Sequence, residues 1–286
     1  MRLALAEFFG MRKRMATYVV LIVLLVLMGL VYFAAGIGAR SVGAEAGGIF
    51  QFPEAYAFIG QFVFGLGSLL AVAYAAAVAG GDWTWGVPRL LIARGHSRAG
   101  YVLAKAVALA GMLAVGVVVA FGVGILLNFA AAAIAGVELG NPIAGDGLVE
   151  LGKSLVLGFP VVIERALIGF AVAIVLRSQL AGVVVGILLY IGEGILVTVM
   201  VAISIFSRGV DLLGGERVGP EWFQYLPFTV GDSVLTPDPA ATIGEGLEGL
   251  ILRQVPLEQA LVAVFLYGLV SVAVSALFVE RAEITA

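Results

Sequence analysis

Residues 18–38 read YVVLIVLLVLMGLVYFAAGIG, and this uncharged apolar run determines the fold class of the chain. A helix needs about 20 mostly apolar residues to cross the hydrocarbon core of a bilayer. The apolar part of a cleaved signal peptide is shorter, about 7–15 residues, so we interpret the run as a membrane span. Five more runs have the same character, and none alternates in polarity as the strands of a membrane barrel do. They lie at about residues 57–80, 107–129, 155–176, 181–206 and 261–279.

The composition of the whole chain agrees with these runs and excludes a soluble enzyme. Of the 286 residues, 62% are hydrophobic and only 12% are charged, whereas soluble domains have about 25% charged residues. The chain has no cysteine and one histidine, His96, which argues against metal centres, and its net charge of −3 gives no basic field for nucleic acid. We therefore predict an all-α integral membrane protein with a single transmembrane domain over residues 1–286 and six transmembrane helices.

The distribution of Lys and Arg predicts the orientation, because these residues are enriched in cytoplasmic loops. With the N-terminus inside, ten of the 16 lie on the inner face, five lie outside and Arg165 lies within the fourth span. The outer loops are instead rich in Asp and Glu. We expect both termini to be cytoplasmic.

Two segments outside the spans have a distinct character. Residues 1–17 combine basic and apolar side chains, as an amphipathic helix at the membrane interface does. Residues 207–256 form an external segment between spans five and six. The aromatic side chains of this segment suit a short helix at the interface, where aromatic rings are favoured. These residues are Trp222, Phe223, Tyr225 and Phe228.

Three charged residues fall inside the predicted spans: Glu164 and Arg165 in the fourth and Glu193 in the fifth. An isolated charge at mid-bilayer costs about 2.5–3.5 kcal/mol on insertion scales, so each requires a partner or water. A tight turn joins spans four and five and makes them neighbours, so we consider an Arg165–Glu193 ion pair, or Glu164 facing a wet cavity. A role in translocation and a purely structural role both stay open, because a buried ion pair serves either.

Two short glycine motifs favour helix packing over nucleotide binding. Residues 147–154, GLVELGKS, match the phosphate-binding P-loop in form. A functional P-loop follows a buried strand, whereas turn-forming residues precede this match, so we interpret it as coincidence. Gly182 and Gly186 lie four residues apart in the fifth span and indicate a close helix–helix contact.

The one sizeable inner loop, residues 81–98, reads GDWTWGVPRLLIARGHSR. Its basic residues alone are explained by the preference of Lys and Arg for the cytoplasmic side. That preference does not explain the acid at the start of the loop or the apolar residues at its centre. An apolar patch surrounded by charge indicates a docking surface for another protein. His96 fits this surface better than a catalytic role.

The loop resembles that of the type-two ABC exporter permeases, the membrane subunits of ATP-driven exporters. In that family the second span ends in a Gly–acid pair, followed by Gly-Thr, a leucine-rich turn, Ser-Arg and a lysine that enters the third span. The matching residues are Gly81, Asp82, Gly86, Leu90, Leu91, Ser97, Arg98 and Lys105, and Val87 departs from the usual threonine. Six spans, the amphipathic N-terminus and the aromatic-Leu-Pro element at residues 225–228 extend the resemblance over most of the chain.

The resemblance implies that residues 82–98 are a coupling helix, which docks into a separate cytoplasmic ATPase present in two copies. The coupling residues would be Asp82, Gly86, Arg89, Leu90, Leu91, Arg94, Ser97 and Arg98. Asp82 would hold the loop by pairing with one of its arginines. ATP and Mg²⁺ would bind the ATPase, so this chain would have no cofactor, no metal and no catalytic residue of its own.

The resemblance also implies a second permease chain, identical or different, in the cytoplasmic (inner) membrane of a prokaryote. The two chains would pair through spans one and five, with Gly182 and Gly186 at the dimer interface. We therefore expect an ABC exporter permease, and its mostly apolar pathway suits a lipophilic or amphipathic substrate.

Two other functional classes compete with the exporter. An ATP-independent secondary transporter or channel would favour internal repeats and broken spans. A membrane enzyme would need catalytic groups clustered at one membrane face. The best such set, Asp82, His96 and Arg98, is explained better by docking. Co-purification with an ATPase separates the exporter from the secondary transporter.

Overall fold

The computed structural model describes residues 2–42, 44–88, 90, 95, 97–143, 147–208, 221–235 and 255–282. Over these residues it has no strand and six helices long and apolar enough to cross a membrane, which confirms the predicted class. The spanning helices are α2 (Met15–Val42), α3 (Ala55–Gly60) continued by the π-helix η2 (Gln61–Leu66) and α4 (Gly67–Thr84), α6 (Arg98–Ala135), α7 (Gly147–Leu176), α8 (Gln179–Arg208) and α11 (Leu257–Glu280). The shorter elements are α1 (Arg2–Arg12), η1 (Ala44–Phe50), η3 (Glu221–Tyr225) and α9 (Pro227–Leu235).

Each predicted span lies inside one of these helical segments, and the helices extend beyond the apolar runs. The reason is that polar residues near a membrane surface continue a helix without adding to its apolar length. α6 shows this clearly. Ser97 caps its N-terminus by accepting a hydrogen bond from the Gly100 amide at 3.1 Å. The helix ends at Gly136, whose φ of 73° is the left-handed conformation that glycine adopts readily.

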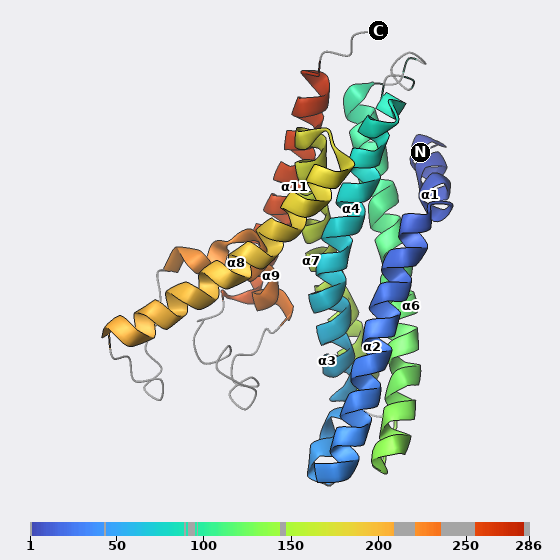
Figure 1. The fold of residues 1–286 in the computed structure, drawn as a ribbon, viewed down its shortest axis with the longest axis vertical. Helices are drawn as coiled ribbons and strands as arrows, with labels where there is room; N and C mark the ends of the chain where they lie inside the picture. Colours follow the sequence, from blue (N-terminus) through green and yellow to red (C-terminus); the bar gives the residue numbers. More distant parts are fainter. Residues whose placement is uncertain are drawn as a thin grey trace.

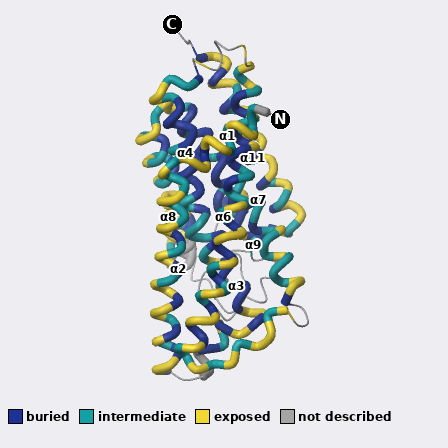
Figure 2. The backbone as a smooth tube through the Cα atoms, turned by 90° about the vertical axis from the view of Figure 1, so that its right-hand side faces the viewer, coloured by how far each residue is buried: buried dark blue, intermediate teal, exposed yellow. Residues whose placement is uncertain are grey.

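The helices α4 and α7 form the centre of the bundle (Figures 1 and 2). In each of these spans 61% of the most apolar stretch is buried within the chain, against 22% for α2 and 11% for α8. Glycine permits α4 and α7 to approach each other closely, because a Cβ on Gly169 of α7 would meet the backbone of Val72 in α4. α8 packs on α4 near its start and then diverges from the bundle (Figure 1).

One end of the bundle holds the N-terminal helix, the end of α11 and the connection between α4 and α6 (Figure 1). α1 packs alongside α6 there, as a helix separate from α2. This arrangement is the one expected if both termini and the loop at residues 82–98 share a membrane face. We call it the terminal end, and its cytoplasmic location stays a prediction.

The helix α9 departs from the expectation for the external segment. Of the four aromatic residues expected on a short helix at the interface, Trp222, Phe223 and Tyr225 lie in η3 and Phe228 lies in α9. The interfacial position of η3 stays a prediction. α9 lies beside the middle of the bundle, packed on α7, α8 and α11 (Figure 1). The physical reason is Arg165, halfway along α7, which needs acceptors at that depth. α9 supplies two of them, as described below. Residues 209–220 and 236–254 of the external segment lie outside the described residues.

The residues that match the P-loop motif form part of a helix. Residues 147–154 are the first two turns of α7, and Lys153 pairs with Glu150 at 2.7 Å on the exposed side of the helix. A helix has no free backbone amides beyond its first turn with which to surround a phosphate. The helical conformation of these residues agrees with the interpretation of this match as coincidence, which stays a prediction.

Candidate functional site

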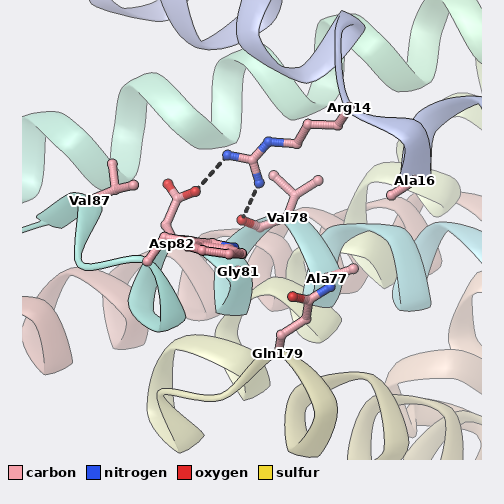
Figure 3. A pocket seen from close by; sticks show the side chains of 9 residues that line it. Arg14, Ala16, Ala77, Val78, Gly81, Asp82, Val87 and Gln179 are labelled. Atoms are coloured by element: carbon pink, nitrogen blue, oxygen red, sulfur yellow. Dashed lines mark hydrogen bonds and ion pairs between the residues drawn. The ribbon is translucent and has the colours of Figure 1, made fainter.

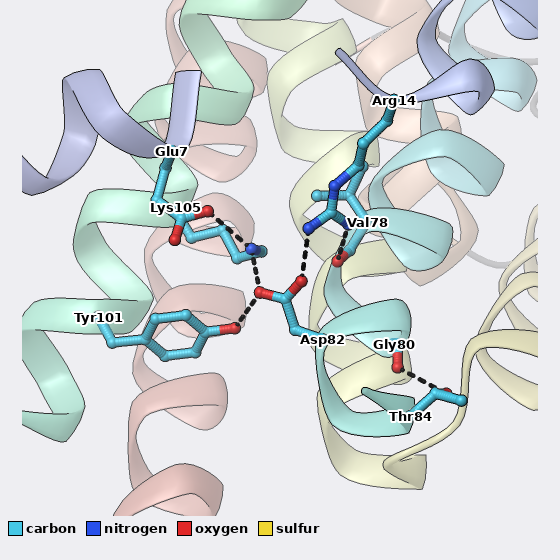
Figure 4. Close-up of polar contacts among 8 residues, drawn as sticks. All are labelled: Glu7, Arg14, Val78, Gly80, Asp82, Thr84, Tyr101 and Lys105. Carbon is cyan, nitrogen blue, oxygen red and sulfur yellow. Dashed lines mark hydrogen bonds and ion pairs between the residues drawn. The ribbon is translucent and has the colours of Figure 1, made fainter. Parts of the chain in front are cut away.

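A buried carboxylate organises the terminal end of the bundle. Asp82 lies in the last turns of α4 with a side chain only 1% exposed, and its two oxygens receive three donors (Figure 4). Arg14 donates to Oδ1 at 2.6 Å and the Tyr101 hydroxyl donates to Oδ2 at 2.7 Å. The Lys105 ammonium donates to Oδ2 as well. We call this set the Asp82 cluster; its members are Glu7, Arg14, Asp82, Tyr101 and Lys105.

Helical periodicity explains how the donors converge. Tyr101 and Lys105 are four residues apart in α6, so they lie on one face of that helix, and both side chains reach Asp82 in the last turns of α4. Lys105 is fully buried and pairs a second time, with Glu7 of α1 at 2.9 Å. Because burial makes an unpaired charge very unfavourable, the second partner stabilises the ammonium at this position. The cluster therefore fastens α1 and α4 to α6.

Arg14 connects the cluster to the start of α2. It stands just before α2, and its Nη1 also donates to the Val78 carbonyl at 3.2 Å. Burial disfavours the charge on this guanidinium, but the ion pair with Asp82 outweighs that effect, so the pKa of Arg14 is raised above its usual value. Arg14 thus stays cationic over the whole physiological pH range.

The predicted pairing of Asp82 with an arginine of its own loop is wrong for Arg98. α4 continues through Thr84, so Asp82 faces α6 from within the bundle and does not reach along the loop. Arg98 instead donates to three carbonyls at the end of α11, those of Val279, Glu280 and Ala282. The other predicted coupling residues Arg89, Leu91 and Arg94, together with His96, lie outside the described residues.

An apolar surface adjoins the cluster. A cavity of about 440 Å³ lies beside Asp82 and is lined also by Arg14, Trp85 and Gln179. Figure 3 shows Arg14, Asp82 and Gln179 around it. On the connection that follows, the side chain of Trp85 is 80% exposed and that of Leu90 is 62% exposed. Gly86 has a φ of 67°, which turns the chain after α4. The described part of the loop therefore presents large apolar side chains outside the bundle.

A second buried cluster surrounds Arg165 in the middle of α7. Its Nη2 pairs with Asp232 of α9 at 2.6 Å and donates to the Phe228 carbonyl at 2.8 Å. Its Nη1 donates to the Phe64 carbonyl at 3.2 Å and to the Tyr190 hydroxyl at 3.4 Å. We call this set the Arg165 cluster; its members are Glu164, Arg165, Tyr190, Glu193, Thr229 and Asp232.

The expected Arg165–Glu193 ion pair is wrong, although both residues belong to this cluster. Glu193 accepts hydrogen bonds from the amide and the hydroxyl of Thr229, at 2.6 and 2.8 Å. Arg165 takes Asp232 as its acid partner. Sequence reasoning missed Asp232 because it lies in the segment predicted outside the membrane. Glu164 is 1% exposed, and neither of its carboxylate oxygens has a hydrogen-bond partner.

The glycines predicted at a dimer interface face the chain's own helices. A Cβ on Gly182 would meet Ala173 of α7, and a Cβ on Gly186 would meet Val72 of α4 at 3.0 Å. Both glycines are buried within the single chain. The predicted close helix–helix contact is confirmed, but it is intramolecular, and these two residues do not line a surface open to a second copy.

The family of proteins of unknown function DUF2705 has a model that matches residues 44–230. The match covers more than half of the chain, so the chain belongs to this family. The matched residues include Asp82 and Lys105 at the terminal end and Glu164 and Arg165 in the middle of the bundle. A comparison with curated proteins gives no match.

Proposed function

We propose that this DUF2705 protein is the membrane-spanning permease subunit of an ATP-driven ABC exporter, and that it works with a separate cytoplasmic ATPase. The observation that carries the proposal is the Asp82 cluster at the base of an exposed connection. The acid, the lysine and the intervening glycine and Ser-Arg positions are those on which the resemblance to type-two ABC permeases rests. The buried network gives these residues a mechanical role.

The Asp82 cluster suits the transmission of force from the loop into the membrane. An ATPase that binds Trp85 and Leu90 acts on a segment that leads directly into α4 and α6. Because Asp82 and Lys105 join these helices through buried charge-assisted hydrogen bonds, a displacement of the loop moves both helices and α1 together. If the ATPase binds one arrangement of the permease more tightly than the other, this binding shifts the permease population between two cavity states.

The proposal includes a second permease chain. The two spans least covered within the chain are α2 and α8, the first and the fifth. These are the spans through which the resemblance implies pairing, and their uncovered faces support a dimer contact, although Gly182 and Gly186 do not take part. ATP and Mg²⁺ bind the ATPase in this proposal, and the permease itself performs no hydrolysis.

The apolar character of the described spans indicates the substrate class. The described spans are apolar apart from a few clustered charges, which favours a lipophilic or amphipathic substrate over a sugar polymer. In this proposal the substrate moves outward across the cytoplasmic membrane of a prokaryote.

The test is co-expression with ABC ATPases of the same genome, followed by purification through a tag on the permease. We expect one ATPase to co-purify, and we expect Trp85→Asp and Leu90→Asp to reduce its recovery about tenfold or more, because an acid in an apolar contact is strongly disfavoured. Ile143→Asp is the matched control: Ile143 is also an exposed apolar residue, 68% exposed, but it lies at the opposite end of the bundle.

The proposal fails if no ATPase is recovered, or if all three variants retain it equally. Reconstitution of the purified pair into vesicles supplies the second measurement, which is ATP-dependent transport. Trp85→Asp and Leu90→Asp should abolish transport while the protein inserts and folds normally.

A secondary transporter is the second candidate, and the Arg165 cluster favours it. Charged residues at mid-membrane depth are typical of ion-coupled pathways. An ion gradient alone would then drive transport by the permease in vesicles that contain no ATPase. Such transport, unaffected by Leu90→Asp, would replace the exporter proposal.

A further inference from the structure

Among the residues that the structure describes, the charges of the Arg165 cluster do not balance. One cation, Arg165, lies among three carboxylates, those of Glu164, Glu193 and Asp232. Asp232 is paired with Arg165, and Glu193 is held by Thr229. Glu164 is the acid left over: it feels the attraction of Arg165 without a hydrogen bond to it, and it lies within electrostatic range of the other two acids and of Tyr267 in α11.

Glu164 has the features of a binding group and lacks those of a structural one. A buried carboxylate without donors is unfavourable, and structural ion pairs avoid that cost by satisfying their oxygens. Both oxygens of Glu164 are buried and without a hydrogen-bond partner. Replacing this residue by an apolar one would improve the fold, so its presence points to a positively charged group from outside the chain.

An apolar groove begins one helical turn away. It lies between α7, α8 and α11, with a volume of about 340 Å³, and its lining is apolar apart from Ser271. Ile168 of the groove stands four residues after Glu164 on the same face of α7. In α11, Ser271 likewise stands four residues after Tyr267, so the groove and the carboxylate share two helices at adjacent levels.

We propose that Glu164 and this groove form a binding site for a lipophilic cation. The positive group of the ligand lies beside the Glu164 carboxylate, and its apolar body fills the groove toward the terminal end. The groove gives apolar contact and the acid gives charge selection, the combination by which small-molecule sites orient their ligands. As an account of the exported substrate, the proposal rests on the proposed function; as a binding site, it stands without it.

The probe is tetraphenylphosphonium, and tetraphenylborate, an anion of nearly the same shape, is its matched control. Binding is measured on the purified full-length chain in nanodiscs of zwitterionic lipid, without an ATPase. We expect saturable binding of the cation and none of the anion. Glu164→Gln should weaken binding of the cation about tenfold or more, because it removes the buried charge partner.

Two further variants separate the site from general effects. Glu150→Gln removes an exposed acid from the same helix and should leave the affinity unchanged. Val274→Phe fills the groove without altering any charge and should weaken binding as Glu164→Gln does. Thermal unfolding of each variant without ligand verifies that it is folded.

The proposal is overturned if Glu164→Gln binds the cation as tightly as the native chain, which is the outcome expected if Glu164 merely retains a proton. Equal binding of the anion and the cation overturns it too. The proposed function is tested in a different experiment: it fails if no ATPase co-purifies with the permease. Binding of the cation without an ATPase would therefore leave this site in place and reassign the protein to the secondary transporters.

Discussion

The Asp82 cluster and the Arg165 cluster both centre on a buried charge, although Asp232 in the second is 69% exposed, and only the first cluster is complete. Asp82 receives three donors, and its partner Lys105 has a second acid in Glu7. In the Arg165 cluster the Nε of Arg165 and both oxygens of Glu164 have no hydrogen-bond partner. The comparison teaches that burial alone does not identify a functional charge. A buried charge whose hydrogen-bond partners are all present holds helices together. In the present proposal, a buried charge that lacks such partners binds a ligand from outside the chain.

Asp82→Ala should cause the largest loss of stability. It removes the shared acceptor of three donors and leaves the Lys105 ammonium buried with Glu7 alone, so we expect a loss of about 3 kcal/mol in the free energy of unfolding, at the lower end of values for broken buried pairs. Denaturant unfolding in detergent micelles measures it. Glu150→Ala breaks an exposed pair and should cost less than about 1 kcal/mol. Equal losses in the two variants would mean that the Asp82 cluster does not fasten the helices.

Glu164→Met should change stability in the opposite direction. The methionine has a similar length, and it removes a buried carboxylate that accepts no hydrogen bond from the described residues, so we expect a gain of roughly 1–3 kcal/mol in the absence of ligand. The same unfolding measurement applies. A loss of stability would show that Glu164 has a structural partner, and the contrast between the two clusters would then be wrong.

Gly231→Ala probes how closely α9 approaches Arg165. A Cβ at this position would meet Cγ1 of Val161 at 2.8 Å and Nη2 of Arg165 at 3.0 Å. Overpacking of this kind costs about 1–3 kcal/mol. Gly192→Ala in α8 is the control, because its Cβ meets nothing within 4 Å. If both alanines stabilise the protein to the same degree, as an unhindered glycine-to-alanine change in a helix does, α9 is not packed on Arg165.

Ser97→Ala should have the smallest effect. It removes the N-cap of α6, the helix that carries Tyr101 and Lys105, at a cost of about 1 kcal/mol. Hydrogen exchange should speed up in the first turn of α6, and the amides around Lys105 should stay protected, because the Asp82 cluster holds that part of the helix. Ser41→Ala, at a serine that caps no helix N-terminus, should leave exchange in α6 unchanged. Faster exchange through Lys105 would show that the cluster depends on the cap.

The sequence predicted the six spans well because apolar length is a local property, readable within one segment. The resemblance to the type-two ABC permeases also singled out Asp82 and Lys105. Sequence reasoning missed Glu7 and Arg14 as partners because the contact between Arg14 and Asp82 joins residues 68 positions apart. It did not predict the packing of α9 on Arg165 for a related reason: nine residues are too few to span a membrane, so hydropathy carried no information on their depth.

The Asp82–Lys105 pair has a consequence for the history of the family. An acid at position 82 and a base at position 105 depend on each other, because the loss of either leaves the other buried with a single oppositely charged partner, Arg14 for Asp82 and Glu7 for Lys105. Across DUF2705 proteins the two positions should therefore be inherited as a unit, both kept or both exchanged for apolar residues. The segment that matches the family contains both of them, whereas Glu7 and Arg14 precede its first residue at position 44.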